Sequence, residues 1–375
     1  MENAPKILAI NPGSTSTKIA LFEGETLLYE ENIAHSVEEL SRFENIYDQL
    51  QYRESLVLES LKAHGTELSE LSAVAGRGGL LPPMEGGVWA VNDDMLDDLR
   101  HRPRRHHPSN LGALIAWDIA TQAGVKLVVI VDPVSTDEFE EIARITGLPE
   151  IKRDSLSHAL NLKAVARLAA REMGKKYEEL NLVVCHLGGG ITVSAHRKGR
   201  MIDCNDPSSS GPFSPERAGD LPNMALAELC YSGKYTEKEM KARLMGKGGL
   251  VAHLGTNSCK EVEERISAGD TRAELVYQAM AYQVAKWIGQ MAVALNGKVD
   301  AICLSGGIAH SGMFIGWIKP RVSWIAPIKV YPGSDEMRAL AMGALRALRG
   351  EEKVKEYRSI ARRMPLPQFT EKVVS

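Results

Sequence analysis

The sequence predicts an α/β fold that arose by duplication, and the main observation is an internal repeat. Residues 6–29 have the pattern of an apolar strand, a polar turn, a second strand, a tight turn and a third strand. Residues 181–204 repeat this pattern. Three pairs of residues keep a constant offset of 175 positions: Asn11 and His186, Gly13 and Gly188, and Gly24 and Gly199. Repetition of this kind indicates two halves of similar architecture, and we expect a nucleotide to bind between them.

The strands that follow these hairpins support the same fold class. Residues 126–131 (KLVVIV) form a fully apolar run, which is typical of a strand in a buried parallel sheet. Residues 301–304 form another apolar run. Helical patterns are expected over five further segments: 36–64, 109–123, 155–175, 271–295 and 337–362. The sequence Thr271–Glu274 reads as a capping box at the start of the longest helix.

The turn of the first hairpin has the composition of an anion site. Backbone amides around Gly13 and the hydroxyls of Ser14 and Ser16 can donate hydrogen bonds to a polyphosphate. Lys18 adds a positive charge. The motif is not a Walker loop, because that loop has a second glycine before its lysine and a helix after it. A hydroxyl-rich surface hairpin is the alternative interpretation.

The second half contains two glycine-rich turns. Gly188, Gly189 and Gly190 allow the backbone to approach a phosphate, since no Cβ stands in the way. Gly306 and Gly307 follow an apolar strand, which fits backbone packed close to a planar base or a phosphate. A structural glycine-rich hairpin and a simple β–α turn remain the alternatives.

Three charged residues lie in loops where α/β proteins place their sites. Arg77 stands between glycines after a short strand, and Asp132 directly follows the strand 126–131. Arg217 lies in an irregular stretch, residues 203–222, which we expect to be too loose for a core. A solvated loop arginine and a turn-forming Asp-Pro are the alternatives. Charge neutralisation by such groups around phosphates is what phosphoryl transfer requires.

Composition excludes several other classes of protein. The 375 residues suffice for two domains, and 44% apolar and 25% charged residues are typical of a soluble globular chain. A net charge of −3 gives no electrostatic basis for binding nucleic acid or membrane. Five cysteines without a CxxC spacing argue against a disulfide framework or a zinc site and fit a reducing cytoplasm. No signal peptide is visible, and no apolar run reaches membrane-spanning length.

Three motifs together resemble the acetate/butyrate kinase family, within the actin-like ATPase superfamily: NPGSTSTKIALF, HLGGG and SGGIAHS. A fourth, GPFSPERAG, is similar to the butyrate kinases of that family. The resemblance covers essentially the whole chain. It implies a duplicated actin-like ATPase (ribonuclease H-like) fold of two domains with a nucleotide cleft between them. The N-terminal domain would comprise residues 1–150 and 337–375, and the C-terminal, nucleotide-binding domain residues 151–336.

The resemblance also implies an activity. It suggests a butyrate kinase that forms butyryl phosphate and ADP reversibly from butyrate and ATP, with Mg²⁺. Acetate kinase, propionate kinase and a non-metabolic actin-like ATPase are the alternatives. The enzyme would be cytoplasmic and a homo-oligomer, at least a dimer. Isobutyrate is a further possible substrate.

Site residues follow from the matched motifs. The residues expected to bind ATP are Asn11, Ser14, Ser16, Lys18, His186, Gly188, Gly189, Gly190, Gly306 and Gly307. The residues expected to act in catalysis are Arg77, Asp132 and Arg217. Arg77 and His106 would bind the carboxylate, and Asn11 and Glu336 the metal. Two departures stand out, since the family's transition-state histidine falls near Asp154, with only His158 close by, and its adenosine contact falls near residues 258–260.

Overall fold

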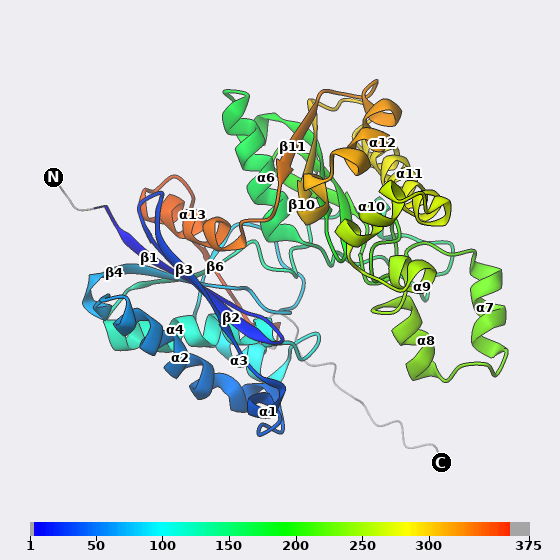
Figure 1. Ribbon diagram of the computed structural model, residues 1–375. Coiled ribbons are helices and arrows are strands. Elements are labelled where there is room, and N and C mark those ends of the chain that lie inside the picture. The colour runs from blue at the N-terminus through cyan, green and yellow to red at the C-terminus, as the bar shows by residue number, and fades with distance from the viewer. Residues whose placement is uncertain (1–3, 361–375) are drawn as a thin grey trace, which may run out of the picture. The chain divides into compact units, whose positions relative to one another are not determined.

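The computed structural model describes residues 4–360, which form two compact units. The first unit contains the chain up to residue 135 and again from residue 337 onward, and the second contains residues 136–336. From the sequence, the first boundary was expected later in the chain, after residue 150. Each unit has its own sheet with helices against it (Figure 1).

The first unit is built on a seven-stranded sheet of order β12-β5-β6-β4-β1-β2-β3. Its strands are β1 (Lys6–Pro12), β2 (Ser16–Glu23), β3 (Thr26–Ala34), β4 (Leu71–Gly76), β5 (Val88–Ala90), β6 (Leu127–Val131) and β12 (Lys355–Glu356). The hairpin strands β1, β2 and β3 pair antiparallel, whereas β1, β4 and β6 run parallel to one another. The carboxyl ends of three neighbouring strands therefore meet at one edge of the sheet.

Helices cover both faces of this sheet (Figure 1). On one face, α4 (Leu111–Ala123) packs on β4, β6 and β1, with α2 (Leu50–Ala63) against α4. On the other face lies α13 (Glu336–Leu348), where a Cβ at Gly343 would come within 2.4 Å of the Val131 side chain, so glycine permits this close approach. The shorter helices are α1 (Val37–Leu40), α3 (Asp93–His101), η1 (Ile46–Gln49), η2 (Leu68–Glu70) and η3 (Pro108–Asn110).

The second unit repeats the strand arrangement of the first. Its five-stranded sheet has the order β11-β10-β7-β8-β9. The strands are β7 (Asn181–Leu187), β8 (Ile191–Arg197), β9 (Arg200–Cys204), β10 (Ala301–Gly306) and β11 (Ile328–Pro332). As in the first unit, a three-stranded antiparallel hairpin is followed by a strand parallel to its first member, here β10 beside β7. The bounds of β1 and β7 differ by the 175 positions read from the sequence, which confirms the duplication.

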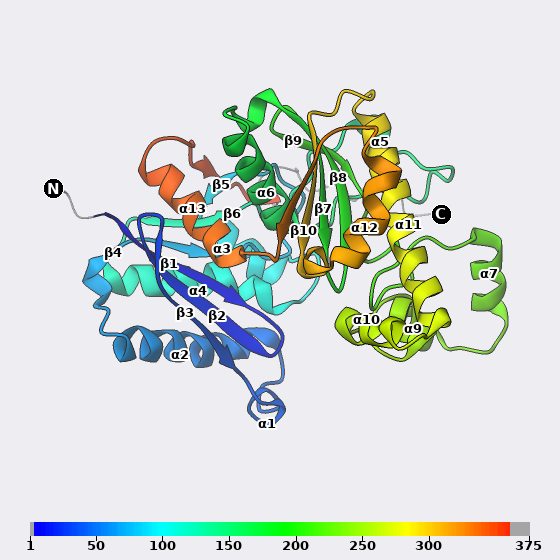
Figure 2. The same ribbon diagram turned by 45° about the horizontal axis from the view of Figure 1, so that its top comes forward.

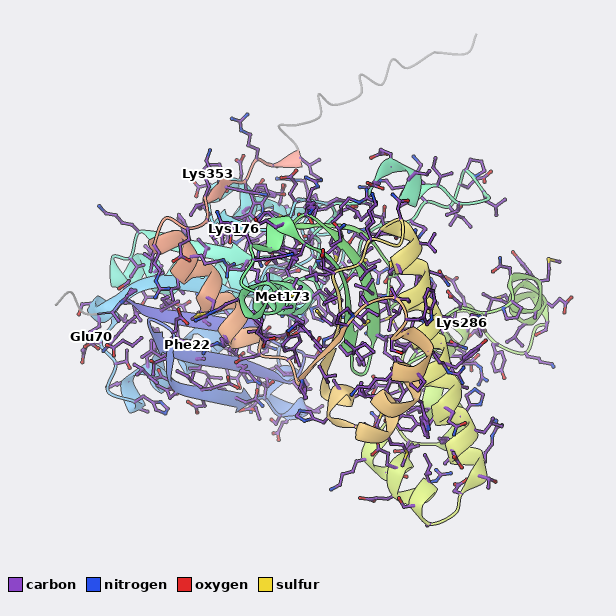
Figure 3. All side chains as sticks on the ribbon, turned by 90° about the horizontal axis from the view of Figure 1, so that it is seen from above. Phe22, Glu70, Met173, Lys176, Lys286 and Lys353 are labelled. Carbon is purple, nitrogen blue, oxygen red and sulfur yellow. The ribbon has the colours of Figure 1, made fainter. Side chains whose placement is uncertain are left out.

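Alternate residues of β7 enter two separate cores. Leu182 and Val184 pack with α6 (Ala159–Glu172), while Val183 and Cys185 pack with α11 (Thr271–Ala294). A further helix, α12 (Gly312–Val322), packs against α11 (Figure 2). Met173, at the end of α6, and Lys286, on α11, are labelled in Figure 3. The remaining helices are α5 (Glu141–Arg144), α7 (Asn223–Tyr231), α8 (Glu237–Leu244), α9 (Gly249–Leu254), α10 (Cys259–Ser267), η4 (Tyr177–Glu179) and η5 (Gly307–His310).

Three helix predictions need correction. The segment 36–64 is not one helix but α1, η1 and α2 in succession, and Ser36 caps the first of them. The cap of α11 is Asp270, whose side chain accepts from the amide of Ala273, rather than a box beginning at Thr271. The helix expected over 337–362 ends at Leu348 and is followed by β12, and its last two residues lie outside the described part of the chain.

No helix within residues 4–360 combines the length and the apolar content needed to cross a membrane.

Candidate functional site

Three predicted residues meet at one edge of the sheet of the first unit. Asn11 lies near the carboxyl end of β1, Arg77 directly follows β4, and Asp132 directly follows β6. These strands are parallel neighbours, and the amide of Arg77 donates to the carbonyl of Ile10 at 2.8 Å. The carboxyl edge of a parallel sheet is where α/β proteins bind ligands. The topology thus brings an amide, a guanidinium and a carboxylate, far apart in sequence, to one edge.

Asp132 is held in an unusual backbone conformation. Its side chain is 1% exposed, and its φ of +37° is rare for a residue with a Cβ. The carboxylate accepts a hydrogen bond from the amide of Gly87 at 2.7 Å, and the amide of Asp132 donates to the carbonyl of Gly87 at 2.9 Å. Strain of this kind persists where the surroundings fix the residue, and it gathers at functional sites.

The loop carrying Arg77 is packed closely against α4. A Cβ at Gly112 would lie 2.4 Å from the carbonyl oxygen of Arg77, so only glycine at this position of α4 admits the loop. Desolvation of the ring and the charge of Arg77 lower the pKa of His107, although the residue as a whole is exposed. His106, the histidine expected at the substrate, has its ring edge-on to that of Tyr47, with ring centres 5.8 Å apart. The charge of Arg77 therefore acts on the imidazole of His107.

The first turn presents an exposed surface beside a lysine. Lys18 pairs directly with Asn11 across the β1–β2 ladder, so both side chains lie on the same face. Its ammonium is 3.3 Å from the carboxylate of Glu30, and both side chains are more than a third exposed, which makes this a weak ion pair that a phosphate can replace. Ser14 is exposed and Ser16 half-buried. The amide of Gly13 donates to the carbonyl of Ser16 at 2.7 Å and closes the turn.

A polar network surrounds His186 at the end of β7. The side-chain amide of Asn161 donates to Nδ1 of His186 at 2.8 Å and to Oγ of Ser305 at 3.0 Å. With Nδ1 accepting, the neutral imidazole carries its proton on Nε2. A Cβ at Gly188 would lie 3.0 Å from this Nε2, so the Nε2 edge faces the glycine turn. The ring of His186 can therefore present a proton donor at the turn.

His158 completes this network and was not assigned a role from the sequence. Its ring stacks on that of His186, with centres 4.1 Å apart and planes inclined by 21°. Nδ1 of His158 lies 2.8 Å from the hydroxyl of Thr192 on β8. Asn161 was also missed, since it belongs to no recognisable motif, and Ser305 was given no role although it begins the motif SGGIAHS. Only the isolated position of His158 close to the expected family histidine gave a signal in the sequence.

Arg217 lies directly against the second turn. A Cβ at Gly190 would be 2.4 Å from Nη1 of Arg217. The hydroxyl of Ser214 donates to the carbonyl of Gly189 at 2.6 Å, which ties the same loop to the turn. Burial lowers the pKa of Arg217, while the charges of Asp206 and Glu216 act in the opposite direction.

The loop around Arg217 is not loose, contrary to expectation. Phe213 belongs to the core of the second unit, and Ser214 is 1% exposed. The carbonyl of Glu216 accepts hydrogen bonds from the amides of Gly246 and Gly248, which fixes the backbone beside Arg217.

The end of β10 is also fixed. Gly306 has φ of +92°, and a Cβ there would lie 2.3 Å from the carbonyl oxygen of Leu187, so this site requires glycine. The amides of Gly306 and Gly333 each donate to the other's carbonyl, at 2.8 and 2.9 Å. Gly307 begins η5 with open space around it.

The donors expected for Mg²⁺ are oxygens, and they fit this ion. Asn11 contributes an amide oxygen and Glu336 a carboxylate. Glu336 begins α13 and is half-buried. Among residues 4–360, no group of three or more His, Cys, Asp or Glu side chains is arranged to hold a metal on its own. Mg²⁺ does not need such a cage, because it keeps several waters and takes only one or two carboxylates beside substrate phosphates.

A groove of about 770 Å³ lies elsewhere, between α11 and α12. Its walls include Tyr282, Trp317 and Trp324, and it contains none of the predicted site residues. The groove is therefore separate from the residues expected to act on ATP and the acid.

The sequence and the fold of this chain are each similar to those of known proteins. Residues 151–316 match the model of the Acetokinase family. The fold is similar to that of the acetate kinase of Porphyromonas gingivalis, with a TM-score of 0.76 and 18% identity over 92% of this chain and 100% of that one. A propionate kinase from Francisella tularensis has a TM-score of 0.73 and 19% identity over 90% of this chain and 98% of that one. The acetate kinase of Entamoeba histolytica has a TM-score of 0.72 and 15% identity, also over 90% of this chain and 98% of that one.

These similarities confirm the duplicated actin-like ATPase fold. They support the resemblance to the acetate/butyrate kinase family, but they do not distinguish butyrate kinases from the other members of that family. Residues 151–316 carry the sequence pattern of the Acetokinase family, and the chain has the fold of acetate and propionate kinases.

Proposed function

We propose that this protein transfers the γ-phosphoryl group of ATP to a short-chain carboxylate, and that the preferred acid is butyrate. The observation that carries the proposal is the placement of Asn11, Arg77 and Asp132 at the carboxyl ends of three adjacent parallel strands. The Acetokinase match and the likeness to acetate and propionate kinases support a carboxylate as the acceptor. The similarity of GPFSPERAG to butyrate kinases supports the longer acid.

In this proposal, Arg77 binds the carboxylate. A guanidinium can hold both oxygens of a carboxylate at once, and the close packing of the Arg77 loop on Gly112 keeps it in place. His107, next to this charge, stays neutral near pH 7 because its pKa is lowered. His106 is retained as the second candidate for contact with the acid.

The two turns bind the phosphates of ATP. The first turn offers Lys18 and the hydroxyls of Ser14 and Ser16 on an exposed surface. The second turn offers the backbone of Gly188–Gly190 and the Nε2 edge of His186. Gly306 and Gly307 form the base-proximal part of the nucleotide site.

The reaction is an in-line displacement that needs no general base. An oxygen of the ionised carboxylate attacks the γ-phosphorus, the bond from that phosphorus to the bridging oxygen of ADP breaks, and ADP leaves with the electron pair. Negative charge spreads over the equatorial oxygens of the transferring group, and Arg217 stabilises it. Asn11 and Glu336 would hold Mg²⁺, which would supply neutralising charge to the phosphates. Asp132 is fixed by Gly87 and keeps its carboxylate at the same sheet edge.

A hydroxamate assay for acyl phosphate across straight and branched C2–C5 acids tests this function. Each buried CH₂ contributes about 0.8 kcal/mol, so butyrate should exceed acetate in kcat/KM by roughly tenfold or more. We assign the segment from Leu80 to Met84, of which Leu81 and Met84 are buried, to the wall that accepts the propyl chain. Equal values for the two acids would instead identify an acetate kinase.

Two alternatives are distinguished by the same assay. An acetate or propionate kinase is favoured by the names of the similar structures, and it would prefer the shorter acids. A non-metabolic actin-like ATPase would hydrolyse ATP at the same rate with or without any acid. We also propose a cytoplasmic enzyme that is at least a dimer, which light scattering on the purified protein can measure.

A further inference from the structure

Arg53 is a buried arginine for which the proposed reaction has no direct use. It lies in the first turn of α2 and is 0% exposed. A positive charge at the start of a helix opposes the helix dipole, and burial of a charge is costly unless it is compensated. Burial lowers the pKa of Arg53 to about 10, so the guanidinium is still charged at neutral pH. Because burial of this charge lowers stability, we looked for a function of Arg53.

The hydrogen bonds of Arg53 converge on the first turn. Nη1 donates to the carbonyls of Gly13 and Ser16, at 3.0 and 3.1 Å, and to the hydroxyl of Thr17 at 3.0 Å. Nε and Nη2 both donate to the side-chain oxygen of Gln49, at 3.1 and 2.9 Å. Within the described part of the chain, these five hydrogen bonds all end on neutral oxygens. The turn is therefore backed by a buried positive charge that no carboxylate neutralises.

These contacts fix which way the peptide groups of the turn point. Every peptide bond among the described residues is trans, so each carbonyl points opposite to the N–H of the same peptide group. The carbonyl of Gly13 points at Arg53, and hence the N–H of Ser14 points away from it, at an exposed residue. The carbonyl of Thr15 accepts from the amide of His35 at 2.8 Å, which fixes the peptide group between Thr15 and Ser16 as well.

We propose that Arg53 is a positioning residue for phosphate binding at the first turn, acting from behind it in two ways. It holds the turn's carbonyls on the inner side, which leaves amide donors on the outer side for an anion. Its uncompensated charge also adds to the attraction of a phosphate placed there. This inference rests on the proposed function, because it requires that the turn binds the phosphates of ATP.

The two contributions are separated by two substitutions. Gln49→Glu gives the guanidinium a carboxylate in place of a neutral oxygen, which cancels the charge while the hydrogen-bond geometry is retained. Arg53→Lys keeps a charge but removes the planar fork that reaches Gly13, Ser16 and Gln49 together. Gln51→Glu adds the same negative charge to an exposed position of α2 and serves as the matched control.

The test compares the dissociation constants of adenosine, ADP and ATP, measured by calorimetry on the full-length protein with Mg²⁺, together with the melting temperature. A merely structural role predicts that Gln49→Glu is neutral or stabilising and leaves binding unchanged. The proposal predicts that Gln49→Glu keeps its melting temperature but loses about tenfold of the preference for ATP over adenosine, as cancellation of a buried charge would produce. Gln51→Glu should behave as wild type.

The outcomes divide clearly. Unchanged nucleotide preference in Gln49→Glu, in a wild type that prefers ATP over adenosine, would refute the inference and leave the proposed function intact. A wild type that binds adenosine and ATP equally well would refute both. Arg53→Lys should show an intermediate loss of ATP affinity with adenosine binding unaffected. If Arg53→Lys fails to fold, Gln49→Glu still decides the question.

Discussion

The contact between Gly190 and Arg217 allows the role of this arginine to be tested without removing it. In Gly190→Ala, the new Cβ would lie 2.4 Å from Nη1 of Arg217, whereas ordinary van der Waals contact begins at 3.4 Å. The guanidinium must therefore move by about 1 Å. It is the far end of a flexible side chain, so we expect this movement to cost little stability. A displacement of about 1 Å of a group that stabilises the transition state can cost about 100-fold in rate.

We therefore expect Gly190→Ala to lower kcat by about 100-fold with a nearly unchanged melting temperature. Arg217→Ala should lower kcat by about 10³-fold, by analogy with other arginines that stabilise phosphoryl transfer. The assay is steady-state acyl phosphate formation with butyrate and ATP. Gly189→Ala provides a control within the same turn, since its Cβ would meet only Glu216, at 3.7 Å, and its effect on kcat should be much smaller.

A double-mutant cycle shows whether the effect of Gly190→Ala passes through the guanidinium. In an Arg217→Ala background, the new methyl group has nothing to displace, so Gly190→Ala should lower kcat no further. If the two substitutions instead multiplied their effects, the methyl group would be acting on the nucleotide or on the turn itself, and the reasoning from the Gly190–Arg217 contact would be wrong.

Four further predictions concern other parts of the site. Asp132→Asn should keep the fold, because asparagine tolerates positive φ, and should lower kcat by about 100-fold or more in the same assay; wild-type kcat would remove Asp132 from the site. Arg77→Ala should raise the KM for butyrate strongly with a smaller loss in kcat, and a pure kcat effect would contradict its role in binding. Glu336→Gln should raise the Mg²⁺ concentration needed for half-maximal rate, and an unchanged requirement would exclude Glu336 from the metal site. Burial and the charge of Arg53 lower the pKa of His35 from its ordinary value of 6.5, while the charge of Glu39 acts in the opposite direction. The stability gained from neutral His35 is therefore present above pH 6.5 and is lost as the pH falls. The melting temperature of the wild type should fall more between pH 8 and pH 5 than that of His35→Gln.

The duplication could be predicted from the sequence because its signals are local. Apolar alternation and turn residues define each hairpin, and the constant offset relates one hairpin to the other. The positions of Asn11, Arg77 and Asp132 were predictable for the same reason, since each lies at the carboxyl end of a recognisable strand. That they lie side by side depends on the strand order β6-β4-β1, which local patterns do not determine.

Contacts between distant segments were not predictable. The stretch 203–222 looked loose because its glycines, prolines and serines have no regular period, yet Phe213 and Ser214 are buried by packing against other parts of the second unit. His158 has no motif around it, and only the fold brings its ring onto that of His186. The prediction of one helix over 36–64 was wrong for another reason. The charged and polar residues of this segment are compatible with three separate elements as well as with one long helix.

The two turns share a repeated pattern but differ in the arginine that contacts each of them. Both turns belong to the repeated pattern, whereas the arginines lie outside it. Arg53 contacts the first turn, and Arg217 contacts the second. The two arginines meet their turns differently. Arg53 donates to carbonyls from a fully buried position, whereas Arg217 lies over a glycine Cα and is only partly buried. A fully buried, hydrogen-bonded guanidinium cannot move to follow a reacting phosphate, so Arg53 suits the binding of a ground state. A guanidinium held by packing at its end can shift as charge develops, so Arg217 suits the transition state.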